Sequence, residues 1–220
     1  MISKHEKIFL IIGAIIILAC LSFYLIAYFP GSMTVDSIEQ WSQMLNFRFN
    51  SWHPVISTLF YYLCTRIWYS PASVAIAQIL ILTGVFVSGI YMLIKLKVNK
   101  VILAITILFF ALYPTNGFLV IVLWKDIMYS IMLLWMTIIL LQILFSKGEW
   151  INSKSHKAIF ILDSLGVLFL RHNGILTFVF VMIALAIIYR EYMKINIKLT
   201  AVILIIYFVV SGPGFKLMGV

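Results

Sequence analysis

The segment from residue 8 to residue 29, IFLIIGAIIILACLSFYLIAYF, contains 22 consecutive residues without a charged side chain. As a helix it is about 33 Å long at 1.5 Å per residue, and the hydrocarbon core of a bilayer is about 30 Å thick. It therefore predicts a first transmembrane helix. Lys4 and Lys7 precede it, as in a cleaved signal peptide, but nine further uncharged residues after Cys20 favour an uncleaved anchor.

The rest of the chain shares this apolar character. Of its 220 residues, 64% are hydrophobic and 10% are charged, against about 25% charged residues in an ordinary soluble domain. We expect one transmembrane domain over residues 1–220. The net charge of +9 lies in short clusters between apolar runs, which is typical of cytoplasmic membrane loops and not of nucleic-acid binding. Two cysteines, Cys20 and Cys64, provide neither a disulfide framework nor a cysteine-rich metal site.

Six further apolar runs are separated by charged or polar segments. They are residues 72–94, 101–123, 127–145, 158–170, 175–189 and 199–212. Pro114 and Gly117 interrupt the second of these runs. The predicted fold class is therefore an all-α polytopic membrane protein with about seven transmembrane helices.

A shorter apolar run, PVISTLFYYLCTRIWY at residues 54–69, decides the predicted topology. Its 16 residues give about 24 Å of helix, which is short for a span. If it lies on the outer surface and the N-terminus is cytoplasmic, eleven of the sixteen cationic residues are cytoplasmic, as the positive-inside rule favours. A crossing segment with an outer N-terminus gives the same count. We prefer the surface segment because it is short and because lysines flank the first span. Residues 30–71, 124–126 and 171–174 then reach the outer face.

The chain after the first span predicts an amphipathic helix that lies at the membrane interface. One helical face carries Asp36, Glu39, Gln40 and Gln43, and the other carries Val35, Ile38, Trp41 and Leu45. Ser32 or Thr34 is placed to cap this helix, which puts Asp36 in its first turn, where the helix dipole favours a carboxylate. The structural alternative is a solvated polar face on which Asp36 is a capping acid.

His53 directly precedes Pro54, which suits the first position of a short second helix. As a candidate functional residue His53 competes with a simpler interpretation, an ordinary residue at the interface. Trp41, Trp52, Trp68 and Tyr69 fit an aromatic belt at the level of the lipid headgroups, and ligand stacking is the alternative role for them.

Two short segments place charges between apolar runs, where charges are costly and mark function. They are Trp124-Lys125-Asp126 and Arg171-His172-Asn173-Gly174. The runs that flank Arg171 have 13 and 15 residues, so a helix pair turning at 171–174 is expected to hold its guanidinium below the interface. A lipid phosphate is the anion that we expect it to bind, because guanidinium binds phosphate through two hydrogen bonds. A snorkelling arginine among headgroups is the alternative. Asp163 is expected to face the interior of the helix bundle.

Together these motifs resemble the membrane glycosyltransferases of the GT-C superfamily, which include the protein O-mannosyltransferases and the aminoarabinose transferase of lipid A. The similarity is greater to a Gram-positive branch of it whose loops read Pro-Gly-x-x-Thr-x-Asp-Ser, Trp-His-Pro, Trp-Lys-Asp and Arg-His-Asn-Gly, as residues 30–37, 52–54, 124–126 and 171–174 do here. The resemblance implies a GT-C-like module in which residues 30–71 form two outer-face jaw helices. It implies transfer of a sugar from a polyprenyl-phosphate donor, with no soluble nucleotide sugar, to an acceptor that is a wall polymer, a lipid or a protein.

The resemblance also implies roles for individual residues. Asp36 would be a general base on the acceptor or a metal ligand, and Asp126 would position the acceptor or assist a divalent cation. Arg171, Lys125 and His172 would bind the donor phosphate, and Glu39, His53, Trp52 and Asn173 would contact substrate. Asp36 lacks the adjacent second acid of the mannosyltransferases, since Glu39 is one turn away, so the need for a cation stays open.

Relatives of this kind continue through further spans and an outer domain. We therefore expect either a shortened chain or completion by a second membrane chain. Two other classes of function compete with a transferase. One is a non-catalytic membrane partner, or a degenerate half of such an enzyme. The other is a lipid or ion transporter, because charged residues within spans also mark transport routes. The expected location is the cell membrane, with a cytoplasmic N-terminus and the active face outside.

Overall fold

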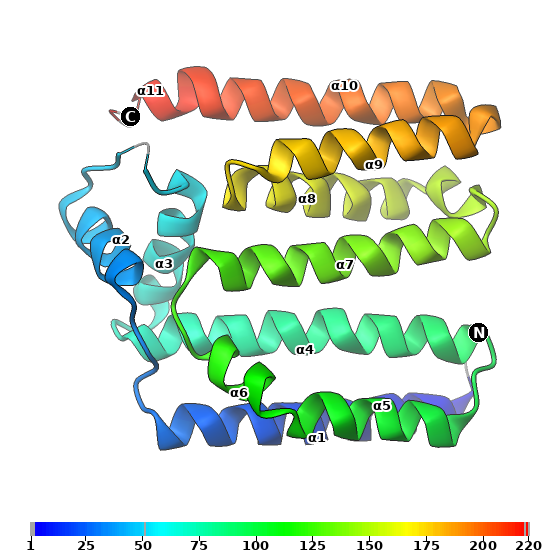
Figure 1. Cartoon of the computed structure of the whole chain (residues 1–220), viewed down its shortest axis with the longest axis horizontal. Coiled ribbons are helices and arrows are strands. Elements are labelled where there is room, and N and C mark those ends of the chain that lie inside the picture. Colours follow the sequence, from blue (N-terminus) through cyan, green and yellow to red (C-terminus); the bar gives the residue numbers. More distant parts are fainter. Residues whose placement is uncertain (1–2, 51, 218, 220) are drawn as a thin grey trace. The chain divides into compact units, whose positions relative to one another are not determined.

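The computed structural model describes residues 3–50, 52–217 and 219, and the regular secondary structure of that part is helical (Figure 1). Its α-helices are α1 (Lys4–Ala27), α2 (Val35–Asn46), α3 (Val55–Ile67), α4 (Pro71–Lys95), α5 (Lys100–Leu112), α6 (Pro114–Val120), α7 (Lys125–Phe145), α8 (Lys154–Leu170), α9 (Gly174–Ile188), α10 (Met193–Val209) and α11 (Phe215–Leu217). Two 3₁₀ turns, η1 (Glu149–Asn152) and η2 (Arg190–Tyr192), and one π-helix, η3 (Val210–Gly214), complete the helical segments described.

The chain divides into two compact units. The first comprises Met1–Ile38 and Phe60–Ile127, and the second comprises Glu39–Leu59 and Met128–Val220. Each unit is described by itself below.

In the first unit α1 packs against α4, α5 and α6. Figure 1 shows α1, α4 and α5 running alongside one another. Ile17, Leu21 and Leu25 form a buried stripe on α1 at the four-residue spacing of a helix face. Gly13 permits a close approach to α5, because a Cβ atom there would lie 2.8 Å from the Ile107 side chain.

The predicted interruption near Pro114 is confirmed. The helices α5 and α6 meet at an angle of 53°, and Pro114 is the first residue of α6. Proline lacks an N–H group and disfavours the helical conformation of the residue before it, and Tyr113 is accordingly extended. A Cβ atom on Gly117 would overlap the ring of Tyr24, so α6 lies directly on α1.

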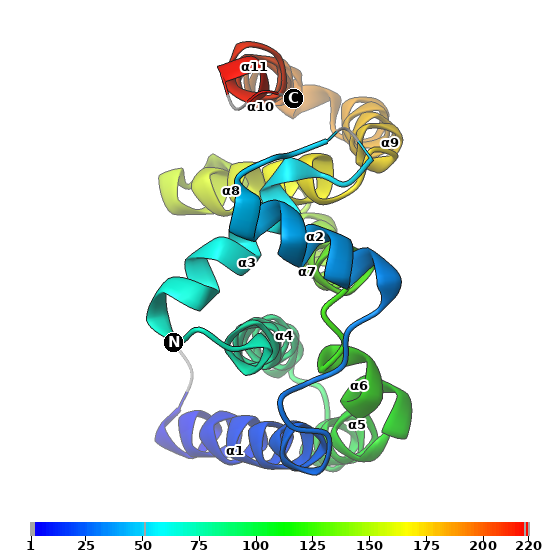
Figure 2. The same cartoon turned by 90° about the vertical axis from the view of Figure 1, so that its left-hand side faces the viewer.

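In the second unit α8 packs against α9 and α10, and α9 packs against α10. In Figure 2, α9 and α10 are seen nearly end-on, and α8 is seen obliquely. The core of this second unit contains Phe160, Val167, Phe178 and Ile203, all fully buried. These residues come from three different helices, α8, α9 and α10.

In the described part of the chain, four helices are long and apolar enough to cross a membrane, and the bent pair of α5 and α6 makes five if it counts as one span. The four are α1, α4, α7 and the segment Arg190–Leu217. These helices correspond to predicted spans. The predicted spans at 158–170 and 175–189 correspond to α8 and α9, which have 17 and 15 residues. The total of seven spans stays a prediction.

The segment 54–69 forms α3, which begins at Val55, one residue later than expected, and ends at Ile67. The Pro54 carbonyl accepts hydrogen bonds from the N–H groups of Ser57 and Thr58. Pro54 is therefore the residue that directly precedes the first turn of α3. The ring of Phe29, just after α1, stacks on the ring of Trp68, just after α3, at 6.1 Å. The chain between these two rings therefore returns to the end of α1 that it left.

The faces of α2 differ from one of our expectations. Thr34 caps the helix, since its Oγ1 accepts from the Ser37 N–H at 3.3 Å, and Asp36 lies in the first turn as predicted. The polar face is not solvated as a whole, however, because Gln40 and Gln43 are buried. The exposed residues include the apolar Val35, Ile38 and Leu45 as well as the polar Glu39, Ser42 and Asn46. The sequence pattern divides a helix into two faces, but it does not determine which face the protein covers.

Candidate functional sites

In the first unit, the loop that follows α1 is joined to the loop that precedes α7. Ser32 pairs with the second loop, with its N–H donating to the Ile121 carbonyl at 3.0 Å and its carbonyl accepting from the Leu123 N–H at 2.9 Å. Gly31 makes this approach possible, because it has a positive φ of 111° and a Cβ atom there would lie 3.1 Å from the Ile121 oxygen. These contacts bring two motifs about ninety residues apart to the same place.

Gln78 of α4 binds the loop that precedes α7 through its side-chain amide. Its Nε2 atom donates to the carbonyls of Val120 at 2.7 Å and Val122 at 3.0 Å, and the side chain is fully buried. The chain between α6 and α7 has left the helical hydrogen-bond pattern, so these carbonyls need other donors in an apolar environment. The sequence analysis did not single out Gln78. An isolated amide within an apolar span was the available signal.

The acid–lysine cluster consists of Asp36, Trp124 and Lys125. The Lys125 Nζ atom lies 3.2 Å from Asp36 Oδ2, and the Trp124 indole N–H donates to the same oxygen at 3.4 Å. The neighbouring Ser37 hydroxyl donates to the Leu123 carbonyl. Both charged side chains are partly exposed, 38% for Asp36 and 16% for Lys125. The cluster therefore holds a carboxylate that is paired with an ammonium group and remains accessible.

Asp126 is half-buried in the first turn of α7, where the helix dipole favours a negative charge. Within the described part of the chain, His, Cys, Asp and Glu form no group of three or more arranged to hold a metal ion. The Asp36 carboxylate that we considered as a ligand already faces the Lys125 ammonium. The residues present there therefore do not fit a cation site.

In the second unit, Glu39 is the centre of a polar network. Its Oε1 atom accepts from Asn50 at 3.0 Å and from Gln43 at 3.4 Å, and its Oε2 atom lies 3.1 Å from His53 Nε2. The hydrogen bonds from Asn50 and His53, which favour the charged form, lower the pKa of Glu39 from its ordinary value. His53 is 1% exposed, so it is not an ordinary residue of the membrane interface.

His53 also lines a cavity of about 220 Å³, which we call the arginine cavity. Its walls come from the start of α3, the turn between α8 and α9, and the C-terminal helices. The lining residues are His53, Pro54, Val55, Leu168, Phe169, Arg171, His172, Tyr207, Ser211 and Phe215. The cavity thus brings together the His-Pro and Arg-His motifs, which are more than 110 residues apart in the sequence.

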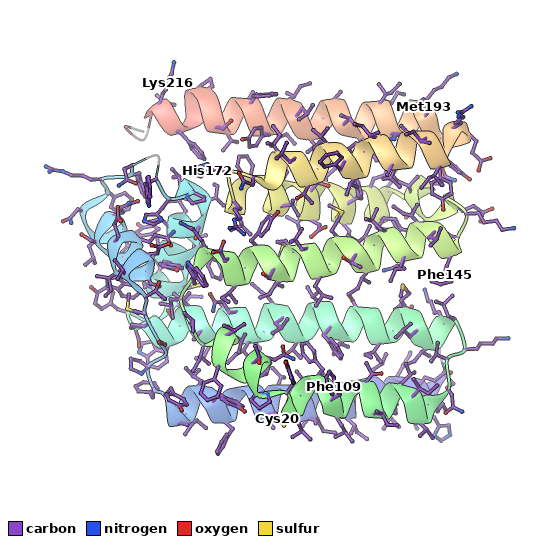
Figure 3. The ribbon with its side chains drawn as sticks, viewed as in Figure 1. Cys20, Phe109, Phe145, His172, Met193 and Lys216 are labelled. Carbon is purple, nitrogen blue, oxygen red and sulfur yellow. The ribbon has the colours of Figure 1, made fainter. Side chains whose placement is uncertain are left out.

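A tight turn places Arg171 at this cavity. The Gly174 N–H donates to the Arg171 carbonyl at 2.9 Å, and Gly174 begins α9 against the backbone of Val167 on α8, where a Cβ atom would overlap. The Arg171 guanidinium carbon lies 5.6 Å from the centre of the Tyr129 ring, and the Tyr129 hydroxyl is 3.1 Å from Thr177 Oγ1. Figure 3 shows His172 where α8 meets α9, and Met193 at the opposite end of α9.

Three other predicted residues lie as follows. Trp52 is 74% exposed, with its backbone N–H bonded to Asn50 Oδ1, which suits an interfacial residue. Asn173 is exposed in the turn before α9 and does not line the arginine cavity. Asp163 is fully buried in α8, as expected for a residue that faces the interior, and in the described part of the chain neither of its carboxylate oxygens has a hydrogen-bond partner.

Comparisons with protein-family models, with curated proteins and with solved structures find no match to this chain.

Proposed function

We propose that this protein is a membrane glycosyltransferase that moves a sugar from a polyprenyl-phosphate donor to an acceptor at the outer face of the cell membrane. The observation that carries the proposal is the arginine cavity, where Arg171, His172 and His53 line one space. Guanidinium and imidazole groups bind phosphate oxygens, and a cavity beside short apolar helices suits a phosphate carried on a lipid.

The leaving group of the reaction determines what the cavity must do. When the acceptor hydroxyl attacks the anomeric carbon, the bond from that carbon to the phosphate oxygen breaks, and the bonding electrons stay on the phosphate. A second negative charge then develops on this group. Arg171 and His172 line the cavity, and cationic donors there would stabilise the charge that develops on the phosphate.

The acid–lysine cluster supplies the other requirement, a group that accepts the proton of the acceptor hydroxyl. Asp36 is suited to this role because its carboxylate is held beside the Lys125 ammonium while part of it remains exposed. Lys125 was expected at the donor phosphate, and its pairing with Asp36 favours a role in orienting this base. Asp126, the residue after Lys125, would position the acceptor.

The Glu39 network would hold His53 in the cavity wall. A buried histidine whose Nε2 faces a carboxylate has a fixed ring orientation, so its contact with a donor phosphate would be defined. Glu39 itself would act through His53 and not through direct contact with the substrate.

The proposed topology has the N-terminus in the cytoplasm and seven spans, with α2 and α3 on the outer surface. The stacking of Phe29 on Trp68 supports this topology, because it brings both ends of the segment between α1 and α4 together. The exposed apolar residues of α2 would then face the lipid.

Turnover by the purified full chain in proteoliposomes tests the proposal. The measurement is release of polyprenyl phosphate from polyprenyl-phosphate glucose, mannose and N-acetylglucosamine, with a membrane extract as the source of acceptor. We expect Asp36→Asn and Arg171→Ala each to lower turnover by about 100-fold or more. Glu149→Gln and Arg190→Ala are matched controls, since both residues are exposed and lie outside the two sites. Full activity of Asp36→Asn or of Arg171→Ala contradicts the mechanism.

A second candidate is transport, which Asp163 favours. A buried carboxylic acid within an apolar helix is a feature of ion and proton pathways. Transport would appear as flux of protons or cations into proteoliposomes that Asp163→Asn abolishes and Asp36→Asn does not change.

A further inference from the structure

Three of the ten residues that line the arginine cavity are phenylalanine or tyrosine. Phe169 of α8, Tyr207 of α10 and Phe215 of α11 line it together with Arg171 and His172. The ring of Phe169 lies 5.3 Å from that of Tyr207 and 6.3 Å from that of Phe215, so the three rings form one cluster. All three side chains are half-buried, which leaves part of each ring available to a ligand.

The π-helix η3 explains how the C-terminal helix keeps these rings on the cavity. Tyr207, Ser211 and Phe215 are spaced by four residues, and at 3.6 residues per turn each such step rotates by about 40° around an α-helix. The wider turn of η3, which contains Pro213, offsets this drift between Ser211 and Phe215. All three residues therefore reach the same cavity.

The cationic side chains and the aromatic cluster of the cavity have different chemistry. Inorganic phosphate presents polar oxygens on every side, and it would leave the three rings without a suitable partner. A phosphate joined directly to an apolar chain would bury that chain against the rings while its oxygens bind the cations. We propose that Tyr207 and Phe215 select a ligand of this kind, and thus that the arginine cavity recognises an amphiphilic phosphate. This inference rests on the proposed function in treating the cavity as the phosphate site.

Binding to the purified full chain in nanodiscs tests this selection. The probes are farnesyl phosphate, dioleoyl phosphatidic acid, glucose 1-phosphate and inorganic phosphate. The variants are Phe215→Ala, Tyr207→Ser and Tyr207→Phe. Phe208→Ala is the matched control, because Phe208 is the next residue on the same helix and is 59% exposed without lining the cavity. The melting temperature and the affinity for inorganic phosphate show whether each variant is folded with an intact cation side.

We expect wild type to bind an amphiphilic phosphate at least 100-fold more tightly than inorganic phosphate. Phe215→Ala and Tyr207→Ser should each weaken that binding by about 10-fold, the loss expected for removing part of an aromatic contact surface, and should leave inorganic phosphate unchanged. Tyr207→Phe, which keeps the ring, should retain the affinity, as should Phe208→Ala. The comparison of farnesyl phosphate with phosphatidic acid identifies whether an isoprenoid or a phospholipid is the source of the phosphate.

Unchanged binding of both amphiphilic phosphates in Phe215→Ala and Tyr207→Ser overturns the inference, and so does an equal loss for glucose 1-phosphate. The two proposals fail separately. If no sugar is transferred but the binding pattern holds, the transferase proposal falls and the selection stands. If sugar transfer depends on Arg171 but not on either ring, the selection falls alone.

Discussion

Substitution of Gly174 by alanine tests whether the close approach of α9 to α8 is what positions Arg171. The new Cβ atom would overlap the Val167 carbonyl oxygen and would lie 2.8 Å from its carbonyl carbon and 3.3 Å from Leu168 Cα. Ordinary contact begins near 3.4 Å, so the backbone must separate by at least 0.6 Å from that carbon, and by more from the oxygen. All three obstacles are backbone atoms, and a change of side-chain rotamer therefore cannot relieve the overlap.

The turn that carries Arg171 and His172 joins these two helices, so it must move with them. We expect about 1–3 kcal/mol of destabilisation, as for other overpacked sites. A displacement near 1 Å in a binding site costs up to about 100-fold in function, so phosphate binding should weaken by about 10-fold to 100-fold.

The assay combines thermal unfolding of the purified protein with titration of inorganic phosphate and farnesyl phosphate. Gly84→Ala is the matched control, because a Cβ atom there has nothing within 4 Å and alanine favours the helix by about 0.5–1 kcal/mol over glycine. Wild-type melting and binding by Gly174→Ala would refute the argument that this glycine fixes the arginine turn.

Two further predictions concern the polar contacts. Gln78→Leu should lower the stability by about 2–4 kcal/mol, because it removes the donor to two carbonyls in the loop between α6 and α7, and a melting temperature equal to that of wild type would contradict this role. Glu39 has a lowered pKa in the folded protein, so its stabilising contribution is present above its unfolded pKa of about 4.3 and is lost as the pH falls through the folded pKa. Glu39→Gln should therefore flatten the dependence of the melting temperature on pH between 6 and 3, and parallel curves for the two proteins would show that the network does not stabilise the carboxylate.

The local features of the fold were predictable from the sequence because they depend on near neighbours. A run of 22 uncharged residues must form a helix if it crosses a bilayer, since its backbone groups have no other partners there. Pro114 breaks a helix wherever the chain places it, and Thr34 caps the helix that follows it through a contact three residues away. The expectation that Asp36 lies in a first turn followed from the same local argument.

The candidate sites depended on contacts that no local pattern contains. The resemblance grouped Lys125 with the phosphate-binding residues, and only the pairing of the loops after α1 and before α7 brings it to Asp36. Phe215 carried no signal in the sequence, because its place in the arginine cavity depends on η3 and on the packing of α10 against α8.

The sequence by itself determined that the chain is helical and apolar enough for a membrane, where its helices break, and which polar motifs interrupt them. The tertiary structure alone decided which face of α2 is covered, which carboxylate pairs with which cation, and which rings lie beside Arg171. The physical reason is how far apart in the sequence the interacting residues lie. Helix formation and capping are settled by residues within one or two turns, whereas a cavity is made by side chains that meet only after the helices have packed.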